Sequence, residues 1–148
     1  IDYIFDPGQQ VTSFTASELK QLITGAKILI GNDYEIKLIL DRLKLNPTNL
    51  EKLVEILVIT KGAQGSEIYS REGRINITPV KVKNIIDPTR AGDAYRAGLI
   101  KGLLSGAGLQ KAGQLASTIA AYAVEHQGTQ AHKFTLKEFT NRYKQNYK

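Results

Sequence analysis

The sequence lacks three residue types with distinctive chemistry or packing. Its 148 residues contain no Cys, no Met and no Trp. Without Cys, a disulfide framework, thiol chemistry and zinc sites with Cys ligands are excluded. No apolar run approaches the ~20 residues that cross a bilayer, and the start of the chain has neither a basic region nor a secretory hydrophobic region. We therefore expect a cytoplasmic protein.

The remaining composition is that of an ordinary globular chain. Hydrophobic residues make up 42% of the sequence and the formal charge is +6. A chain of this length buries roughly 70% of its unfolded surface. Lys and Arg are scattered, so neither nucleic acid nor a membrane is an expected partner. We expect a single domain over residues 1–148, without repeats or linkers, and the missing initiator Met suggests a part of a larger design.

Short apolar runs alternate with segments of helical periodicity. Strands are expected at 3–5, 28–30 and 56–59, and helices over about 16–25, 33–43, 47–54, 94–104, 109–126 and from 136 onward. Capping-box spacing begins the first and last of these helices. A hairpin is expected from 66–70 and 75–80 around the turn 71–74. Repeated βα units with one hairpin predict an α/β fold with a mostly parallel sheet flanked by helices.

The first candidate site is the turn formed by Ala91, Gly92 and Asp93, which opens a long helix. In open α/β sheets, ligands bind beyond the carboxyl ends of strands, where such turns meet helix N-termini. The free amides and the positive end of the helix dipole favour a phosphate group. Asp93 is either a base beside that phosphate or a cap of its own helix, and the spacing alone favours the cap.

Two further turns are weaker candidates. The loop after Thr60 contains Gly62 and Gly65, whose backbone can approach a nucleotide closely or can merely connect a strand to a hairpin. Asn32 and Glu35 lie one helical turn apart and present oxygen ligands that suit magnesium. An N-cap followed by an exposed Glu is the alternative for this second pair.

Four motifs carry a family resemblance when they are taken in order: NDYE, TKGAQG, DPTRAGDAYRAG and VEHQGTQ. They resemble the C-terminal half of the ribokinase-like (PfkB) sugar and nucleoside kinases over almost the whole chain. Together with DPGQQ near the start, they are most similar to bacterial and archaeal adenosine or nucleoside kinases. The resemblance implies a ribokinase-like α/β fold and ATP-dependent phosphoryl transfer, with Mg²⁺, to the hydroxymethyl group of a nucleoside or sugar.

The resemblance implies a role for each residue of the first turn. Asp93 takes the proton from the attacking hydroxymethyl group, and the amides of Ala91, Gly92 and Asp93 form an anion hole. Arg90 departs from the family pattern, which has Gly or another very small residue there. Its cation either contacts phosphate or crowds the anion hole, and a positive φ at this position would add about 1 kcal/mol of strain.

The same resemblance assigns the two weaker turns to the nucleotide. Asn32 and Glu35 match the motif that organises magnesium and phosphate. Thr60, Gly62 and Gly65 match the loop on the nucleotide side. Phosphoryl transfer depends mainly on positioning and charge stabilisation, so these assignments form a coherent scheme.

The remaining assignments concern the adenine base and a second cation. Gly128 and Ser117 fall where the family lines the adenine pocket, and Asp87 and Thr89 fall where many members bind a monovalent cation such as K⁺. The family's N-terminal half, with its lid and most sugar contacts, is absent, so a separate N-terminal half or a homo-oligomer is an expected partner. The alternative function is a truncated, catalytically impaired nucleotide-binding or assembly module that retains the kinase fold.

Overall fold

The computed structural model describes residues 1–127 and 133–147. The chain packs as two compact units: the first comprises Ile1–Lys61 and Glu67–Ile75, and the second comprises Gly62–Ser66 and Asn76–Lys148. The single domain expected from the sequence stays a prediction. Among the described residues, every helix is too short or too polar to span a membrane.

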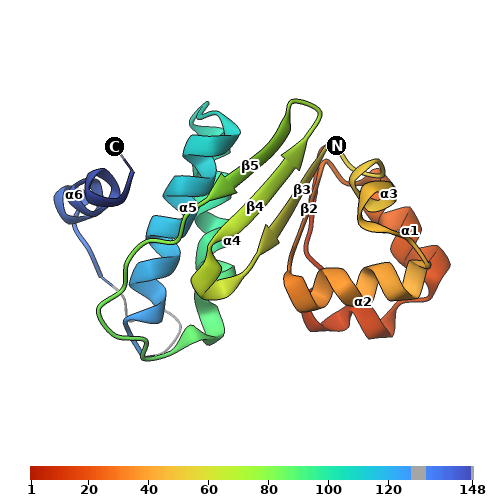
Figure 1. Cartoon of the computed structure of the whole chain (residues 1–148), viewed down its shortest axis with the longest axis horizontal. Helices are drawn as coiled ribbons and strands as arrows, with labels where there is room; N and C mark the ends of the chain where they lie inside the picture. Colours follow the sequence, from red (N-terminus) through yellow and green to blue (C-terminus); the bar gives the residue numbers. More distant parts are fainter. Residues whose placement is uncertain (128–132, 148) are drawn as a thin grey trace. The chain divides into compact units, whose positions relative to one another are not determined.

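Five strands form one sheet in the order β1-β2-β3-β4-β5 (Figure 1). They are β1 (Ile4–Phe5), β2 (Ile28–Asn32), β3 (Ile56–Thr60), β4 (Ser66–Ser70) and β5 (Gly73–Ile77). The first three strands pair in parallel, which aligns Ile28 with Ile56 and Asn32 with Thr60. The carboxyl ends of β2 and β3 therefore meet at one edge of the sheet. The predicted α/β class with a mostly parallel sheet is confirmed.

In the first unit, helices cover one side of β2 and β3 (Figure 1). They are the 3-10 helix η1 (Gly8–Ser13) and the α-helices α1 (Ala16–Gly25), α2 (Asp33–Leu43) and α3 (Pro47–Glu51). Their apolar residues join those of the strands in a core of Val11, Leu19, Ile23, Leu29, Ile36, Ile39, Leu50 and Leu57. The capping box predicted at Thr15 is present at the start of α1. Burial of this face stabilises the parallel strands and fixes the positions of their ends.

Two predicted boundaries in the first unit differ from the structure. Helix α3 ends at Glu51 and not near residue 54, because the chain turns back so that the amide of Ile56 can donate to the Lys27 carbonyl. The hairpin turn is also shorter than 71–74, since β5 already begins at Gly73. η1 was not expected, because its sequence has no helical apolar period.

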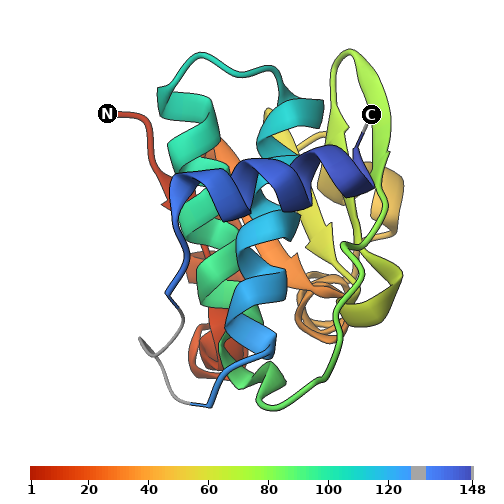
Figure 2. The same cartoon turned by 90° about the vertical axis from the view of Figure 1, so that its left-hand side faces the viewer.

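The second unit is built on two helices that pack unusually closely. It contains the 3-10 helix η3 (Pro88–Arg90) and the helices α4 (Ala91–Leu104), α5 (Leu109–Val124) and α6 (Leu136–Asn146). Helices α4 and α5 run side by side, and α6 crosses α5 (Figure 2). A Cβ on Gly98 would lie 2.7 Å from the Cα of Ala116. Only glycine allows this approach, which holds α4 and its first turn against α5.

Candidate functional site

The carboxylate of Asp93 lies in the first turn of α4 and pairs with arginine side chains. Asp93 is the third residue of α4, and its side chain is 58% exposed. Its oxygens lie 2.6 Å from Nη2 of Arg96 and 3.8 Å from Nη1 of Arg90. The N-cap position of α4 also carries no side-chain hydrogen bond. The described partners of this carboxylate are therefore guanidinium groups and not helix amides, and the acid remains accessible from solvent.

The first turn of α4 presents positive groups around open space. The amides of the first helical turn have no partner within an α-helix, and the dipole makes this end positive. In this helix the amide of Ala91 is already used, since it donates to the Pro88 carbonyl of η3. A Cβ added to Gly92 would meet no atom within 4 Å. The amides of Gly92 and Asp93, with two guanidinium groups beside them, can hold an anion.

Arg90 does not strain the backbone. Its φ is −107° and its ψ is 8°, which lies outside the left-handed region. The strain that the sequence analysis attached to a positive φ at this position is therefore absent. Its side chain is 50% exposed, with the guanidinium facing Asp93. This arrangement suits the first alternative for Arg90, contact with a phosphate group.

The two glycines of the predicted nucleotide loop have different structural requirements. Both have positive φ, 53° at Gly62 and 88° at Gly65. A Cβ on Gly65 would lie 2.1 Å from the carbonyl oxygen of Ile77, whereas one on Gly62 would meet nothing within 4 Å. Gly65 is thus required by packing inside the second unit. Gly62 leaves open space at the loop surface.

A buried hydrogen bond that the sequence analysis missed connects this loop to α4. The hydroxyl oxygens of Ser66 and Tyr95 are 2.7 Å apart. The two residues are 3% and 5% exposed, and burial raises the pKa of Tyr95 to about 12. No local pattern reveals a pair 29 residues apart. Arg96 was also missed, although its spacing of three residues from Asp93 is typical of helical ion pairs.

Asn32 and Glu35 form a complete capping box at the start of α2. The Asn32 side chain accepts from the Glu35 amide and the Glu35 side chain accepts from the Asn32 amide, both at 2.8 Å. The N-cap alternative is therefore confirmed for this pair. One oxygen of Glu35 has no part in the box and remains for a cation, which fits Mg²⁺ because this ion usually takes one or two carboxylates together with phosphate oxygens.

Several residues predicted to bind the monovalent cation or the adenine base already make hydrogen bonds within the fold. The Asp87 carboxylate accepts from the amide of Thr89 at 3.0 Å and caps η3. The buried Ser117 hydroxyl accepts from the amide of Val80 at 3.4 Å. Gly128 lies outside the described residues. Within 1–127 and 133–147, no three His, Asp or Glu side chains gather as a metal site.

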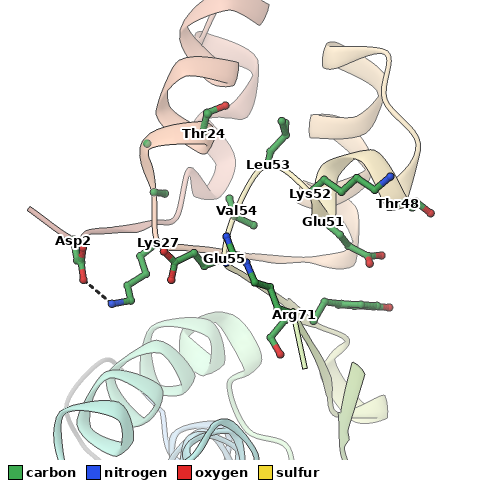
Figure 3. A pocket seen from close by; sticks show the side chains of 14 residues that line it. Asp2, Thr24, Lys27, Thr48, Glu51, Lys52, Leu53, Val54, Glu55 and Arg71 are labelled. Atoms are coloured by element: carbon green, nitrogen blue, oxygen red, sulfur yellow. Dashed lines mark hydrogen bonds and ion pairs between the residues drawn. The ribbon is translucent and has the colours of Figure 1, made fainter. Parts of the chain in front are cut away.

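A cavity of about 540 Å³ opens in the first unit, away from every predicted site residue (Figure 3). Its walls include Lys27 and Glu55, which directly precede β2 and β3, and Arg71 of the hairpin turn. Lys27 is paired with Asp2 at 2.6 Å. The cavity thus lies at the amino ends of the parallel strands. Ligands of open α/β sheets bind at the opposite, carboxyl ends.

Comparisons with known sequences agree with the resemblance seen in the motifs. The profile of the pfkB family of carbohydrate kinases matches residues 2–135. The nucleoside kinase of Methanothermobacter thermautotrophicus is 38% identical over 130 residues, which are 86% of this chain and 41% of that protein. The nucleoside kinase of Methanocaldococcus jannaschii is 34% identical over 128 residues, 86% of this chain and 42% of that protein. The chain spans less than half the length of these curated relatives.

Solved structures show the same similarity in three dimensions. The nucleoside kinase of Burkholderia thailandensis in complex with ADP-inosine superposes with a TM-score of 0.96 at 36% identity, over 99% of this chain and 46% of that one. The Methanocaldococcus jannaschii nucleoside kinase, described as an archaeal member of the ribokinase family, gives a TM-score of 0.91 at 32% identity over 96% of this chain and 48% of that one. The predicted ribokinase-like architecture is confirmed.

Proposed function

Because this chain belongs to the pfkB family of carbohydrate kinases, we propose that it forms the nucleotide-binding and catalytic part of an ATP-dependent nucleoside kinase. The observation that carries the proposal is the exposed Asp93 carboxylate in the first turn of α4, with two guanidinium groups beside it. The relatives at 34–38% identity are nucleoside kinases, which supports a nucleoside over a simple sugar as the acceptor. The acceptor atom is the oxygen of a hydroxymethyl group.

The proposed reaction needs one base and one anion-binding surface. Asp93 removes the hydroxyl proton as the acceptor oxygen attacks the γ-phosphorus of ATP. The new P–O bond forms while the bond from the γ-phosphorus to the β,γ-bridging oxygen breaks, so ADP leaves with the electron pair. A positioned base of this kind contributes about 10²–10⁴-fold to the rate. Asp93 must then exchange its contact with Arg96 for the hydroxyl of the acceptor.

Positive groups at the start of α4 offset the charge of the phosphoryl group. The amides of Gly92 and Asp93 and the guanidinium of Arg90 are proposed to hold phosphate oxygens. Mg²⁺, when bound, neutralises the phosphates, and the free oxygen of Glu35 is the proposed protein ligand. Asp87 and Thr89 are proposed ligands of a monovalent cation. Thr60, Gly62, Gly65, Ser117 and Gly128 are proposed nucleotide contacts.

The proposal also concerns the part of the kinase that this chain does not match. The curated relatives are more than twice as long as the matched segment. We propose that turnover requires that additional part, whereas nucleotide binding does not. If the chain is instead a catalytically impaired module, no turnover should appear even when the additional part is supplied.

The first test is calorimetry on this chain. ATP and ADP with Mg²⁺ are expected to bind, and Asp93→Asn is expected to retain nucleotide affinity within about threefold, since the base contacts the acceptor and not the nucleotide. A chain that binds neither nucleotide would contradict the proposal.

The second test is turnover in a chimera. The region of the kinase that this chain does not match is taken from the Methanothermobacter thermautotrophicus nucleoside kinase, and inosine is the acceptor. Asp93→Asn is expected to lower turnover by about 10²–10⁴-fold. Asp41→Asn, which neutralises an exposed acid on α2, is the matched control and should have no effect. Turnover that survives in Asp93→Asn excludes the assigned base, and a chimera that binds ATP without any turnover supports the impaired module.

A further inference from the structure

The hydrogen bond between Ser66 and Tyr95 joins two of the proposed nucleotide-binding segments of the second unit, the loop 62–65 and the start of α4. Ser66 directly follows Gly65 at the end of the glycine loop, and Tyr95 lies two residues after Asp93 in α4. We propose that this pair is a positioning device, which sets the spacing between the loop 62–65 and the first turn of α4. The inference rests on the proposed function, because it assigns both segments to one nucleotide.

The surroundings of the pair make this spacing rigid. The two hydroxyl oxygens are 2.7 Å apart, and both residues are almost fully buried. A buried hydroxyl without a partner is costly, so the loop and the helix cannot separate easily. On the loop side, Gly65 is locked by its close approach to the Ile77 carbonyl. On the helix side, α4 is held against α5 by the contact at Gly98.

The shape of a nucleotide explains why such a spacing matters. In the proposed function, one part of the nucleotide contacts the loop 62–65, whereas its phosphates contact the start of α4. A ligand that spans two sites binds well only when both lie at the correct distance, and a misplacement of about 1 Å can cost an enzyme about 10²-fold in reaction rate. The Ser66–Tyr95 pair is the direct side-chain link between these segments in the described residues.

The experiment compares four forms of the full chain by calorimetry with ADP and Mg²⁺. The forms are the unchanged chain, Tyr95→Phe, Ser66→Ala and the double variant. Each single variant is expected to weaken ADP binding by about tenfold. The double variant is expected to be no weaker than the singles, because both changes remove the same link.

The double variant separates positioning from a simple folding role. A purely structural role predicts that the double variant regains ADP affinity, because neither hydroxyl then lacks a partner. The positioning role predicts that affinity stays low. Tyr69→Phe is the matched control, since its hydroxyl lies in the same hairpin but donates to Glu67 at 2.6 Å and not to α4. It should leave ADP affinity unchanged.

Hydrogen exchange provides a readout that does not depend on nucleotide. In Tyr95→Phe, the amides of 62–66 and 91–93 should exchange faster, and those of α1 and α2 should not change. Unchanged exchange in the loop, or recovery of ADP affinity in the double variant, would overturn the inference. If the unchanged chain binds no ADP, the proposed function is contradicted on its own, and faster exchange in Tyr95→Phe would still support the structural link.

Discussion

Helices α2 and α4 each carry an acid as their third residue, yet the two acids are used differently. The Glu35 carboxylate of α2 accepts a hydrogen bond from the Asn32 amide, and the Asn32 side-chain oxygen accepts one from the Glu35 amide. At the start of α4, the N-cap residue Arg90 makes no side-chain capping bond, and the carboxylate of Asp93 contacts Arg96. The start of α2 therefore has side-chain capping hydrogen bonds, and the N-cap of α4 has none.

Under the proposed function, this difference is a loss of helix stability at the start of α4 in exchange for ligand binding. A side-chain N-cap contributes typically about 1 kcal/mol, and α4 forgoes it. In the proposed function, the exposed Asp93 carboxylate and the amides of Gly92 and Asp93 are used by the ligand instead. At α2 the capping role comes first, and a ligand can use only the oxygen of Glu35 that the box leaves over. The comparison can be tested at both helix starts.

The largest difference in stability is expected between Asn32→Ala and Asp93→Asn. Asn32→Ala removes the cap of α2 and should lower the free energy of unfolding by about 1 kcal/mol. Asp93→Asn should change it by less than about 0.5 kcal/mol, because this exposed side chain caps nothing. Urea unfolding measures both values. Equal losses in the two variants would mean that Asp93 stabilises its helix as Glu35 does.

A smaller effect is expected at the capping box of α6, and it depends on pH. The backbone and side-chain hydrogen bonds from Thr135 lower the pKa of Glu138 below its ordinary value of 4.5. Its contribution to stability is therefore complete above pH 4.5 and is lost as the pH falls through the folded pKa. The thermal midpoint of Glu138→Gln should lie below that of the unchanged chain at pH 6, and this difference should shrink as the pH falls below 4.5. A gap that stays constant with pH would contradict this.

The smallest effect is expected for Arg90→Gly. Glycine is well tolerated at an N-cap and the φ of −107° is open to any residue, so stability should change by less than about 0.5 kcal/mol. Affinity for ADP should fall by about two- to fivefold, as for the loss of one exposed charge contact. Calorimetry decides between the two alternatives for this residue, because tighter binding in Arg90→Gly would show that Arg90 crowds the anion hole.

The helices with strong local signals were predicted accurately. The capping boxes at Thr15 and Thr135 place the starts of α1 and α6 correctly, because the side chain and the amide that it binds are only three residues apart. The end of α3 was predicted too late, since it depends on the pairing of Ile56 beside β2. A helix start that is set by residues within one helical turn can be predicted from the sequence. A helix end that is set by pairing with a neighbouring strand cannot.

The candidate site shows the same difference between features that short motifs indicate and features that depend on contacts between distant segments. Ordered motifs identified the start of α4, the glycine loop and the family. They did not indicate that the Asp93 carboxylate faces two guanidinium groups, nor that Ser66 bonds to Tyr95. Both facts depend on side-chain directions, and the second also depends on a contact between distant segments. For Arg90, the backbone conformation had to be seen before the expected strain could be dismissed.

The amino-acid sequence by itself determined the α/β class, the helix starts and the kinase family, because periodicity, caps and motifs act over short distances along the chain. The tertiary structure decided which acid takes part in a capping box and which pairs with arginines, and which loop is joined to α4. These outcomes follow from packing, since burial forces polar groups to find partners wherever the fold brings them together. Ser66 and Tyr95, which are 29 residues apart, come into contact only when α4 and the hairpin have packed together.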